Sequence, residues 1–117
     1  MGTRVLIVDD FEAFRRLARA MLEGDGFEVV GEAADGESAV EQAAKLSPEV
    51  VLLDIQLPGS DGFAVADRLA AAPGAPAIVL ISSRDAAGYR RRLAGSPARG
   101  FIPKAELSGE RLAALLA

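Results

Sequence analysis

Val5-Leu6-Ile7-Val8-Asp9-Asp10 is the most informative stretch of this chain, because four consecutive apolar residues lead directly into two adjacent carboxylates. A second apolar run, at residues 50–53, leads in the same way into Asp54. Runs that are apolar at every position are typical of buried strands in a parallel sheet, and such sheets bring the carboxyl ends of neighbouring strands to one edge. We therefore expect Asp9, Asp10 and Asp54 to lie together there.

Three carboxylates held close together repel one another and lose part of their hydration. A hard divalent cation with oxygen ligands is the usual means of holding such a group together. The sequence therefore predicts a Mg²⁺ (or Mn²⁺) site at this edge of the sheet.

The composition limits the kind of protein that this chain can be. With 117 residues, half of them hydrophobic but only 5% aromatic, it predicts one domain over residues 1–117 with an aliphatic core and no output domain. The absence of Cys and His excludes disulfides, thiol nucleophiles, zinc fingers and Ser-His-Asp catalysis.

The net charge of −4 argues against direct nucleic-acid binding. No apolar run approaches the roughly 18 residues of a membrane span, and no signal peptide precedes the first strand, so we expect a cytoplasmic location without membrane contact.

Short apolar runs alternate with amphipathic segments, which is typical of repeated βα units around a parallel sheet. Strands are expected at residues 4–8, 27–31, 49–53, 77–81 and 100–102. Helices are expected between them and at the end, in the segments 11–23, 36–46, 63–70, 84–93 and 109–117. The first helix has apolar residues at three-and-four spacing, namely Phe11, Phe14, Leu17, Ala18, Met21 and Leu22. The helix at 84–93 should be poor, because Gly88 lies inside it. The segment 57–62 reads as a loop.

The predicted fold is an α/β three-layer sandwich, flavodoxin-like (βα)5, with a five-stranded parallel sheet in the order 2-1-3-4-5. This order places Ser82 after the fourth strand and Lys104 after the fifth strand near the three carboxylates. Each of these residues alone has an ordinary explanation as a helix cap, a turn former, a loop hydroxyl or a surface charge. Their expected convergence from distant segments is the stronger signal.

Four motifs carry a resemblance to a known family. They are Val5-Leu6-Ile7-Val8-Asp9-Asp10, the segment from Leu53-Asp54 to Asp61-Gly62, Leu80-Ile81-Ser82-Ser83, and Gly100-Phe101-Ile102-Pro103-Lys104. In this order and spacing, the chain resembles from end to end the receiver domain of response regulators of bacterial two-component signal transduction systems.

The resemblance implies that Asp54 accepts a phosphoryl group from the phosphohistidine of a sensor histidine kinase or a phosphotransfer protein. It implies that Asp10 and Asp54 bind Mg²⁺ directly, that Asp9 acts largely through water, and that the backbone carbonyl of Gln56 completes the metal ligands. The chain would then be a phosphoacceptor switch rather than an enzyme, although one that assists its own phosphorylation and dephosphorylation.

The same resemblance assigns the remaining site residues. Lys104 would contact a phosphoryl oxygen as a point charge, and Ser82 would move toward the phosphorylated Asp54. Phe101 matches the aromatic switch residue on the fifth strand. The face formed by the fourth helix, fifth strand and fifth helix would then change its affinity for a partner or for a second copy of the chain.

Several features depart from the family pattern or add to it. Lys104 is followed by Ala105, where many receivers have a cis-proline. Gln56 and Arg84 lie two residues after Asp54 and Ser82, beside the route of the hydrolytic water, and predict slow loss of the phosphoryl group. The glycine-bearing helix at 84–93 leads to the hypothesis that this segment is mobile or partly unformed. The basic run at 89–92 is open to three readings: a solvated helix face, a contact for an acidic partner or homodimer, and, third, a nucleic-acid contact.

Other functions remain open at this point. The chain is either a single-domain regulator or the receiver fragment of a DNA-binding transcriptional regulator. A phosphohydrolase with an aspartyl nucleophile is a different class, and it is disfavoured because Gln56 stands where haloacid dehalogenase-type enzymes have a second acid. A receiver-like scaffold without phosphorylation is a third option. A dinucleotide-binding site is excluded, because no glycine-rich turn follows the first strand.

Overall fold

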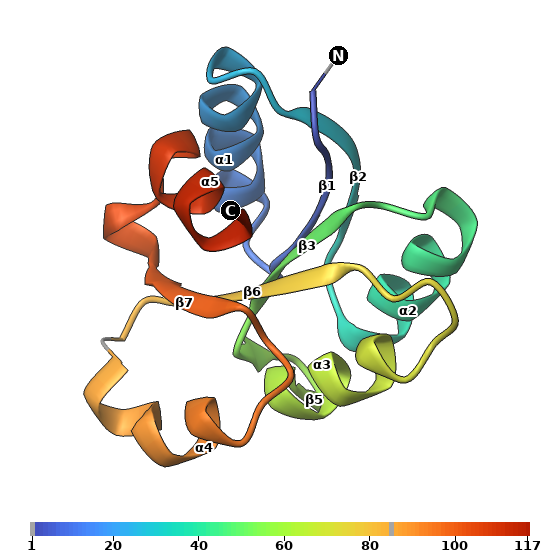
Figure 1. Cartoon of the computed structure of the whole chain (residues 1–117), viewed down its shortest axis with the longest axis vertical. Helices are drawn as coiled ribbons and strands as arrows, with labels where there is room; N and C mark the ends of the chain where they lie inside the picture. The colour runs from blue at the N-terminus through green and yellow to red at the C-terminus, as the bar shows by residue number, and fades with distance from the viewer. Residues whose placement is uncertain (1, 85) are drawn as a thin grey trace.

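The computed structural model describes residues 2–84 and 86–117 of the chain. Within these residues, five parallel strands form the central sheet in the order β2-β1-β3-β6-β7 (Figure 1). Their bounds are β1 (Arg4–Val8), β2 (Glu28–Ala33), β3 (Val50–Asp54), β6 (Ala77–Ser82) and β7 (Gly100–Pro103). Counting only these five strands, the order is 2-1-3-4-5, so the predicted flavodoxin-like topology is confirmed.

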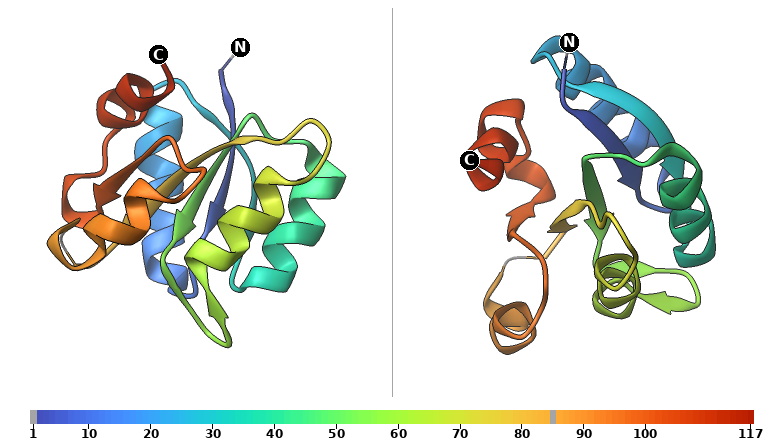
Figure 2. Two further views of the ribbon diagram at one scale, coloured as in Figure 1. Left: turned by 60° about the horizontal axis from the view of Figure 1, so that its bottom comes forward. Right: turned by 45° about the vertical axis from the view of Figure 1, so that its right-hand side comes forward.

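Helices cover both faces of the sheet, which gives three layers (Figure 2). Two helices, α1 (Glu12–Gly24) and α5 (Gly109–Leu116), lie on one face. The other face carries α2 (Gly36–Leu46), α3 (Gly62–Ala70) and the short α4 (Arg90–Ala94). Two hydrophobic clusters fill the spaces between the layers, because alternate residues of each strand point to opposite faces. On β1, for example, Val5 and Ile7 belong to the cluster under α1, and Leu6 and Val8 belong to the other.

Side chains cap the starts of α2 and α5. The side chain of Asp35 accepts a hydrogen bond from the Ser38 amide at the start of α2. The side chain of Ser108 accepts from the Arg111 amide at the start of α5. Each cap satisfies one of the backbone donors that a helix start leaves without an intrahelical partner.

The expected bounds of four strands are corrected by the structure. The second strand covers 28–33 rather than 27–31, because its pairing with β1 continues until Ala33 meets Val8. The third strand runs one residue further than expected, so Asp54 itself pairs with Ile81 of β6. The fourth and fifth strands likewise continue to Ser82 and Pro103, which pair with each other.

The segment expected to be a loop after Asp54 contains a small antiparallel hairpin. Its strands are β4 (Gln56–Leu57) and β5 (Ser60–Asp61). Gly59, between them, has a φ of +65°, a left-handed conformation that glycine adopts without steric cost. The hairpin leads directly into α3, whose first turn is capped by the Asp61 side chain.

The first and fourth helices also differ from simple expectation. Phe11, at the N-cap of α1, and Leu17, within the helix, are 70% and 61% exposed, although both lie in the apolar pattern of the sequence. The buried contacts are made instead by Ala18 and Leu22, because the apolar stripe is wider than the area that meets the sheet. The segment expected to be a poor helix is a 3₁₀ turn, η1 (Ala86–Tyr89), followed by α4. Asp85, which lies in the same predicted segment, is outside the described residues.

Candidate functional site

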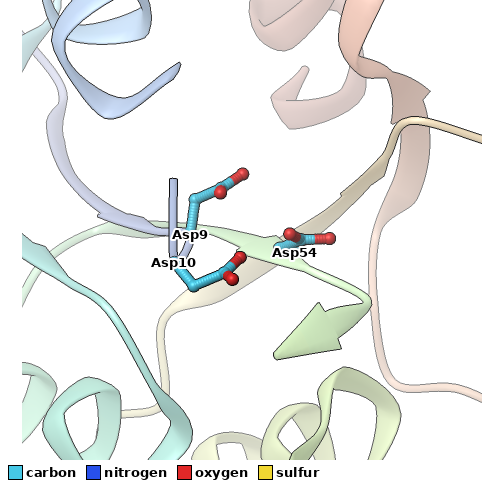
Figure 3. Close-up of side chains that lie close together, drawn as sticks. All are labelled: Asp9, Asp10 and Asp54. Carbon is cyan, nitrogen blue, oxygen red and sulfur yellow. The ribbon is translucent and has the colours of Figure 1, made fainter. Parts of the chain in front are cut away.

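Three carboxylates meet at the carboxyl end of the sheet, as the sequence predicts. Asp9 and Asp10 follow β1, and Asp54 is the last residue of β3, which is next to β1 in the sheet. Carboxylate oxygens of the three residues all lie within 4.8 Å of one another (Figure 3). Asp9 and Asp54 are buried, whereas Asp10 is exposed. The site is therefore open to solvent on the side of Asp10 and enclosed on the side of the sheet.

Asp54 is held in place by a donor at each of its two oxygens. Its Oδ1 accepts a hydrogen bond of 3.0 Å from the Gln56 amide, and its Oδ2 accepts one of 3.2 Å from Lys104 Nζ. The pKa of the Asp54 carboxyl is raised above its usual range, chiefly because burial disfavours the charged form and also because the Asp9 carboxylate is close. The Gln56 amide and the Lys104 ammonium act in the opposite direction but do not outweigh burial.

Lys104 joins the site from the residue directly after β7. Its Nζ lies 2.6 Å from Asp9 Oδ2 and 3.2 Å from Asp54 Oδ2, so one ammonium group bridges two carboxylates. Burial on its own would lower the pKa of Lys104, but the hydrogen bond to Asp9 and the charges of Asp54 and Asp9 raise it. The ammonium is therefore held in its charged form beside the carboxylates.

Ser82 and Phe101 lie on the two strands beyond Asp54. Ser82 is fully buried at the end of β6, one position after Ile81, which pairs with Asp54. Its Oγ accepts a hydrogen bond of 3.1 Å from the Arg84 amide, which leaves the hydroxyl hydrogen available to another acceptor. Phe101 is half-buried on β7, and its ring packs 6.3 Å from the ring of Tyr89.

Gln56 and Arg84 are exposed and line one hollow of about 360 Å³ at the edge of the site, together with residues of β5, η1 and α4. Arg92, on the same side, pairs with the Asp61 carboxylate and covers the ring of Phe63, with its guanidinium carbon 4.3 Å from the ring centroid. Burial raises the pKa of Asp61, but the pairing with Arg92 and the hydrogen bonds from the Phe63 and Ala64 amides together hold it below its usual range. The ion pair between Arg92 and Asp61 also connects α4 to the hairpin that follows Asp54.

Two contacts of the site were not anticipated from the sequence. Lys104 Nζ lies 4.7 Å from the centroid of the Phe14 ring, so an aromatic face supports the ammonium group. Arg15 Nη1 donates a hydrogen bond of 2.5 Å to the backbone carbonyl of Asp9. Phe14 and Arg15 lie in the first turns of the helix that follows Asp9 and Asp10. This closeness in sequence to the two aspartates is the only sequence signal that would have predicted a place for them at the site.

The donor set suits a hard divalent cation. It consists of carboxylate oxygens, with no softer ligand among the three residues, and oxygen ligands are those that Mg²⁺ prefers. Both oxygens of Asp9 are already engaged, Oδ1 by the Phe11 amide at 2.8 Å and Oδ2 by Lys104. Asp54 likewise has a donor at each of its oxygens, so the exposed Asp10 is the carboxylate best placed to contact a cation directly.

Comparisons with known proteins agree with this geometry. Residues 5–117 match the model of the response regulator receiver domain. The chain is 43% identical over 115 residues to a protein-glutamate methylesterase/protein-glutamine glutaminase of Alkalilimnicola ehrlichii, covering 94% of this chain and 29% of that protein. It is 38% identical over 112 residues to a putative transcriptional regulator of Pseudomonas aeruginosa, covering 96% and 54% respectively. The chain thus spans less than a third of one relative and about half of the other.

The solved structure of the signal receiver domain of the putative response regulator NarL from Mycobacterium tuberculosis superposes with a TM-score of 0.86. The two chains are 30% identical, and the match covers 99% of this chain and 98% of that one. This chain belongs to the receiver domain family of two-component response regulators, whose general function is phosphoryl transfer. Among its described residues, no helix has the length and apolar character needed to cross a membrane.

Proposed function

We propose that this chain is a phosphorylation-controlled switch in which Asp54 accepts the phosphoryl group. The observation that carries the proposal is the single ammonium group of Lys104, which contacts Asp9 and Asp54 in a pocket where three carboxylates meet. These residues come from β1, β3 and the end of β7, and their proximity gives a nucleophile, a cation and an oxygen-rich metal site in one place.

In the transfer step, a carboxylate oxygen of Asp54 attacks the phosphorus of a phosphohistidine. The new O–P bond forms as the N–P bond breaks, and the imidazole leaves with the electron pair and takes up a proton. Lys104, whose Nζ contacts Asp54 Oδ2 at 3.2 Å, would contact an equatorial phosphoryl oxygen instead. The Gln56 amide holds Asp54 Oδ1 and so orients the carboxylate for attack.

Asp10, Asp54 and the backbone carbonyl of Gln56 would hold Mg²⁺, or Mn²⁺, directly. Asp9 would act through water; its Oδ1 accepts a hydrogen bond from the Phe11 amide, and its Oδ2 is ion-paired with Lys104. When bound, the cation neutralises charge on the transferring phosphoryl group. Asp9 would thus have two roles: it would hold the cation through water, and it would keep Lys104 beside the reacting oxygen of Asp54.

The readout would begin at Ser82. Its hydroxyl hydrogen can be donated to a phosphoryl oxygen on Asp54, and this new bond would shift Ser82 and the Arg84 amide that now bonds to it. Phe101 lies on the adjacent strand and packs against Tyr89, so the shift would reach the face formed by α4, β7 and α5. This face would then change its affinity for a protein partner or for a second copy of the chain.

The phosphorylated state would end when water attacks the phosphorus and Asp54 leaves as a carboxylate, releasing inorganic phosphate. The exposed side chains of Gln56 and Arg84 flank this approach and would slow it. The chain would thus assist its own phosphorylation and dephosphorylation but modify no other molecule.

The partners follow from the proposed chemistry. The donor would be a sensor histidine kinase or a phosphotransfer protein in the cytoplasm. The longer relatives, which carry the names of a methylesterase and of a transcriptional regulator, support the idea that receivers of this kind control attached domains. A role as the receiver of a DNA-binding regulator is the more specific form of this proposal, supported by the similarity to a putative transcriptional regulator over 96% of this chain.

The test is incubation of the chain with Mg²⁺ and a small acyl phosphate, followed by intact mass measurement. We expect one added phosphoryl group in the unmodified chain and in Asp67→Asn, whose exposed aspartate on α3 is a matched control. Asp54→Asn should gain none. Phosphorylation of Asp54→Asn would overturn the assignment, and sustained turnover of a phosphate ester would instead favour a phosphohydrolase.

A further inference from the structure

A charged cluster lies behind the acidic pocket, between α1 and β2. Glu32, on β2, pairs through Oε1 with Arg15 Nε at 3.0 Å and through Oε2 with Arg19 Nε at 2.8 Å. The Arg15 side chain is only 14% exposed and that of Glu32 27%. A carboxylate held by two guanidinium groups at this depth is more constrained than a typical surface ion pair.

Arg15 connects this cluster to the backbone of the metal-binding pair. Its Nη1 donates to the carbonyl oxygen of Asp9, and that carbonyl belongs to the peptide bond between Asp9 and Asp10. Because a peptide unit is planar from one Cα to the next, a bond that fixes its carbonyl oxygen also fixes the orientation of the plane. The hydrogen bond from Arg15 therefore helps to set the position of the Asp10 Cα, from which the Asp10 side chain extends.

Both sides of Asp9 are thereby anchored to consecutive residues of β2. The Asp9 amide donates to the Ala33 carbonyl at 3.0 Å, and the Asp9 carbonyl is held through Arg15 by Glu32. The guanidinium group is planar and presents its Nε and Nη1 donors in a fixed relation. The location of the Glu32 carboxylate therefore determines where the Asp9 carbonyl is held.

The geometry points to Arg15 as a positioning residue that, braced by Glu32, orients the Asp9–Asp10 peptide so that the Asp10 carboxylate faces the metal site. This inference rests on the proposed function, in which Asp10 binds the divalent cation directly. Arg15 does not itself touch the cation or the reacting atoms, and its effect passes through the backbone of Asp9.

Charge and position predict opposite effects for the loss of Arg15. A cation beside a cation-binding pocket lowers the affinity of that pocket through repulsion, so removing its charge should strengthen Mg²⁺ binding. If Arg15 instead positions the ligands, its removal should weaken Mg²⁺ binding, because the Asp9–Asp10 peptide loses its support. Residues that hold metal ligands in this indirect way typically change metal affinity by about 10–100-fold when mutated.

The experiment measures the Mg²⁺ dissociation constant by calorimetry, without phosphodonor, for the unmodified chain, Arg15→Gln, Arg15→Lys and Arg16→Gln. We expect about a tenfold weaker affinity for both Arg15 variants, since lysine keeps the charge but cannot make both contacts. Arg16, whose side chain is 79% exposed, is the neighbouring control and should leave the affinity unchanged. Unchanged or tighter Mg²⁺ binding by Arg15→Gln would overturn the inference.

Two further measurements separate positioning from general damage. The Mg²⁺ concentration that gives half the maximal phosphorylation rate should rise in Arg15→Lys, whereas the rate at saturating Mg²⁺ should stay close to that of the unmodified chain. If Arg15→Gln does not fold, Glu32→Asp takes its place, because it keeps the charge and withdraws the carboxylate by one methylene. It should weaken Mg²⁺ binding in the same direction, and unchanged binding would count against the inference. Failure of the unmodified chain to bind Mg²⁺ would refute the proposed function instead.

Discussion

Lys104 Nζ lies 3.2 Å from Asp54 Oδ2, although the two residues are 50 positions apart in the chain. The same ammonium lies 2.6 Å from Asp9, so one cation offsets the repulsion between two buried carboxylates. The contact joins the ends of β3 and β7, which are separated in the sheet by β6. It therefore links the residue proposed to be phosphorylated to the strand that carries Phe101.

Removal of the Lys104 charge should destabilise the folded chain. In Lys104→Met, Asp9 and Asp54 lose their shared cation, and breaking a buried ion pair typically lowers the free energy of unfolding by about 3 kcal/mol. Mg²⁺ should restore part of this loss, because it binds the folded state and replaces the missing positive charge. Urea unfolding with and without Mg²⁺ measures both effects, and Lys45→Met, on the exposed side of α2, is the control. Equal stability of Lys104→Met and the unmodified chain would contradict this account of the pocket.

Replacement of Phe14 should loosen Lys104 without changing any charge. Phe14→Leu removes the aromatic face under the ammonium, and we expect the free energy of unfolding to fall by about 1 kcal/mol. The rate of phosphorylation by an acyl phosphate should also fall, because Lys104 is held less firmly beside Asp54. Phe11→Leu, at an exposed position three residues earlier, should change neither quantity. Equal effects of the two substitutions would show that the ring contact with Lys104 has no role.

The ion pairs of Glu32 predict a dependence of stability on pH. Burial tends to raise the pKa of Glu32, but its bonds to Arg19 and Arg15 outweigh burial and lower the pKa in the folded state below its usual value of 4.5. A carboxyl whose pKa is lower in the folded state stabilises the fold fully above the unfolded value and loses this contribution as the pH falls through the folded value. Glu32→Gln should therefore be less stable than the unmodified chain by about 1 kcal/mol at neutral pH. The difference should shrink as the pH falls below 4.5 and disappear once the pH is below the folded pKa. Thermal unfolding of both proteins at a series of pH values tests this prediction. A stability difference between them that grows toward acid pH would contradict it.

The pairing of Arg92 with Asp61 should hold α4 against the rest of the domain. Arg92→Ala removes that ion pair and the cover over the Phe63 ring, and we expect faster amide hydrogen exchange across residues 86–94. Arg91→Ala, next to it on the exposed surface, is the matched control. The same measurement tests the hypothesis that this glycine-bearing segment is mobile, which uniformly strong protection in the unmodified chain would refute.

The side chain of Arg84 should prolong the phosphorylated state. Arg84 is exposed and lines the hollow beside Gln56, where the hydrolytic water is proposed to approach. Arg84→Ala should lose its phosphoryl group several-fold faster in a time course followed by intact mass. Arg90→Ala, which removes the same charge from the start of α4, should not. A half-life that is unaltered by Arg84→Ala would remove Arg84 from the account of phosphoryl-group lifetime.

The strands and the gathering of the carboxylates were predictable from local pattern. Apolar runs of four or five residues followed by Asp or Ser mark three of the buried parallel strands, β1, β3 and β6, because in such a sheet both faces of a strand are covered by helices. The parallel order then brings Asp9, Asp10 and Asp54 to one edge. The caps at Asp35 and Ser108 were equally readable, since they depend on residues within one turn.

The supporting contacts depended on the tertiary structure. Phe11 and Phe14 look alike in the apolar pattern of the sequence, yet one is exposed and the other lies under Lys104, because the docking angle of α1 decides which residue meets Lys104. The reach of Arg15 to both Glu32 and the Asp9 carbonyl likewise depends on how α1 lies against β2. The spacing of apolar residues along the chain predicts which face of a helix or strand is buried, because burial repeats with the period of the backbone. It does not predict which distant residue packs against that face, because strand register and helix docking depend on the packing of the whole domain.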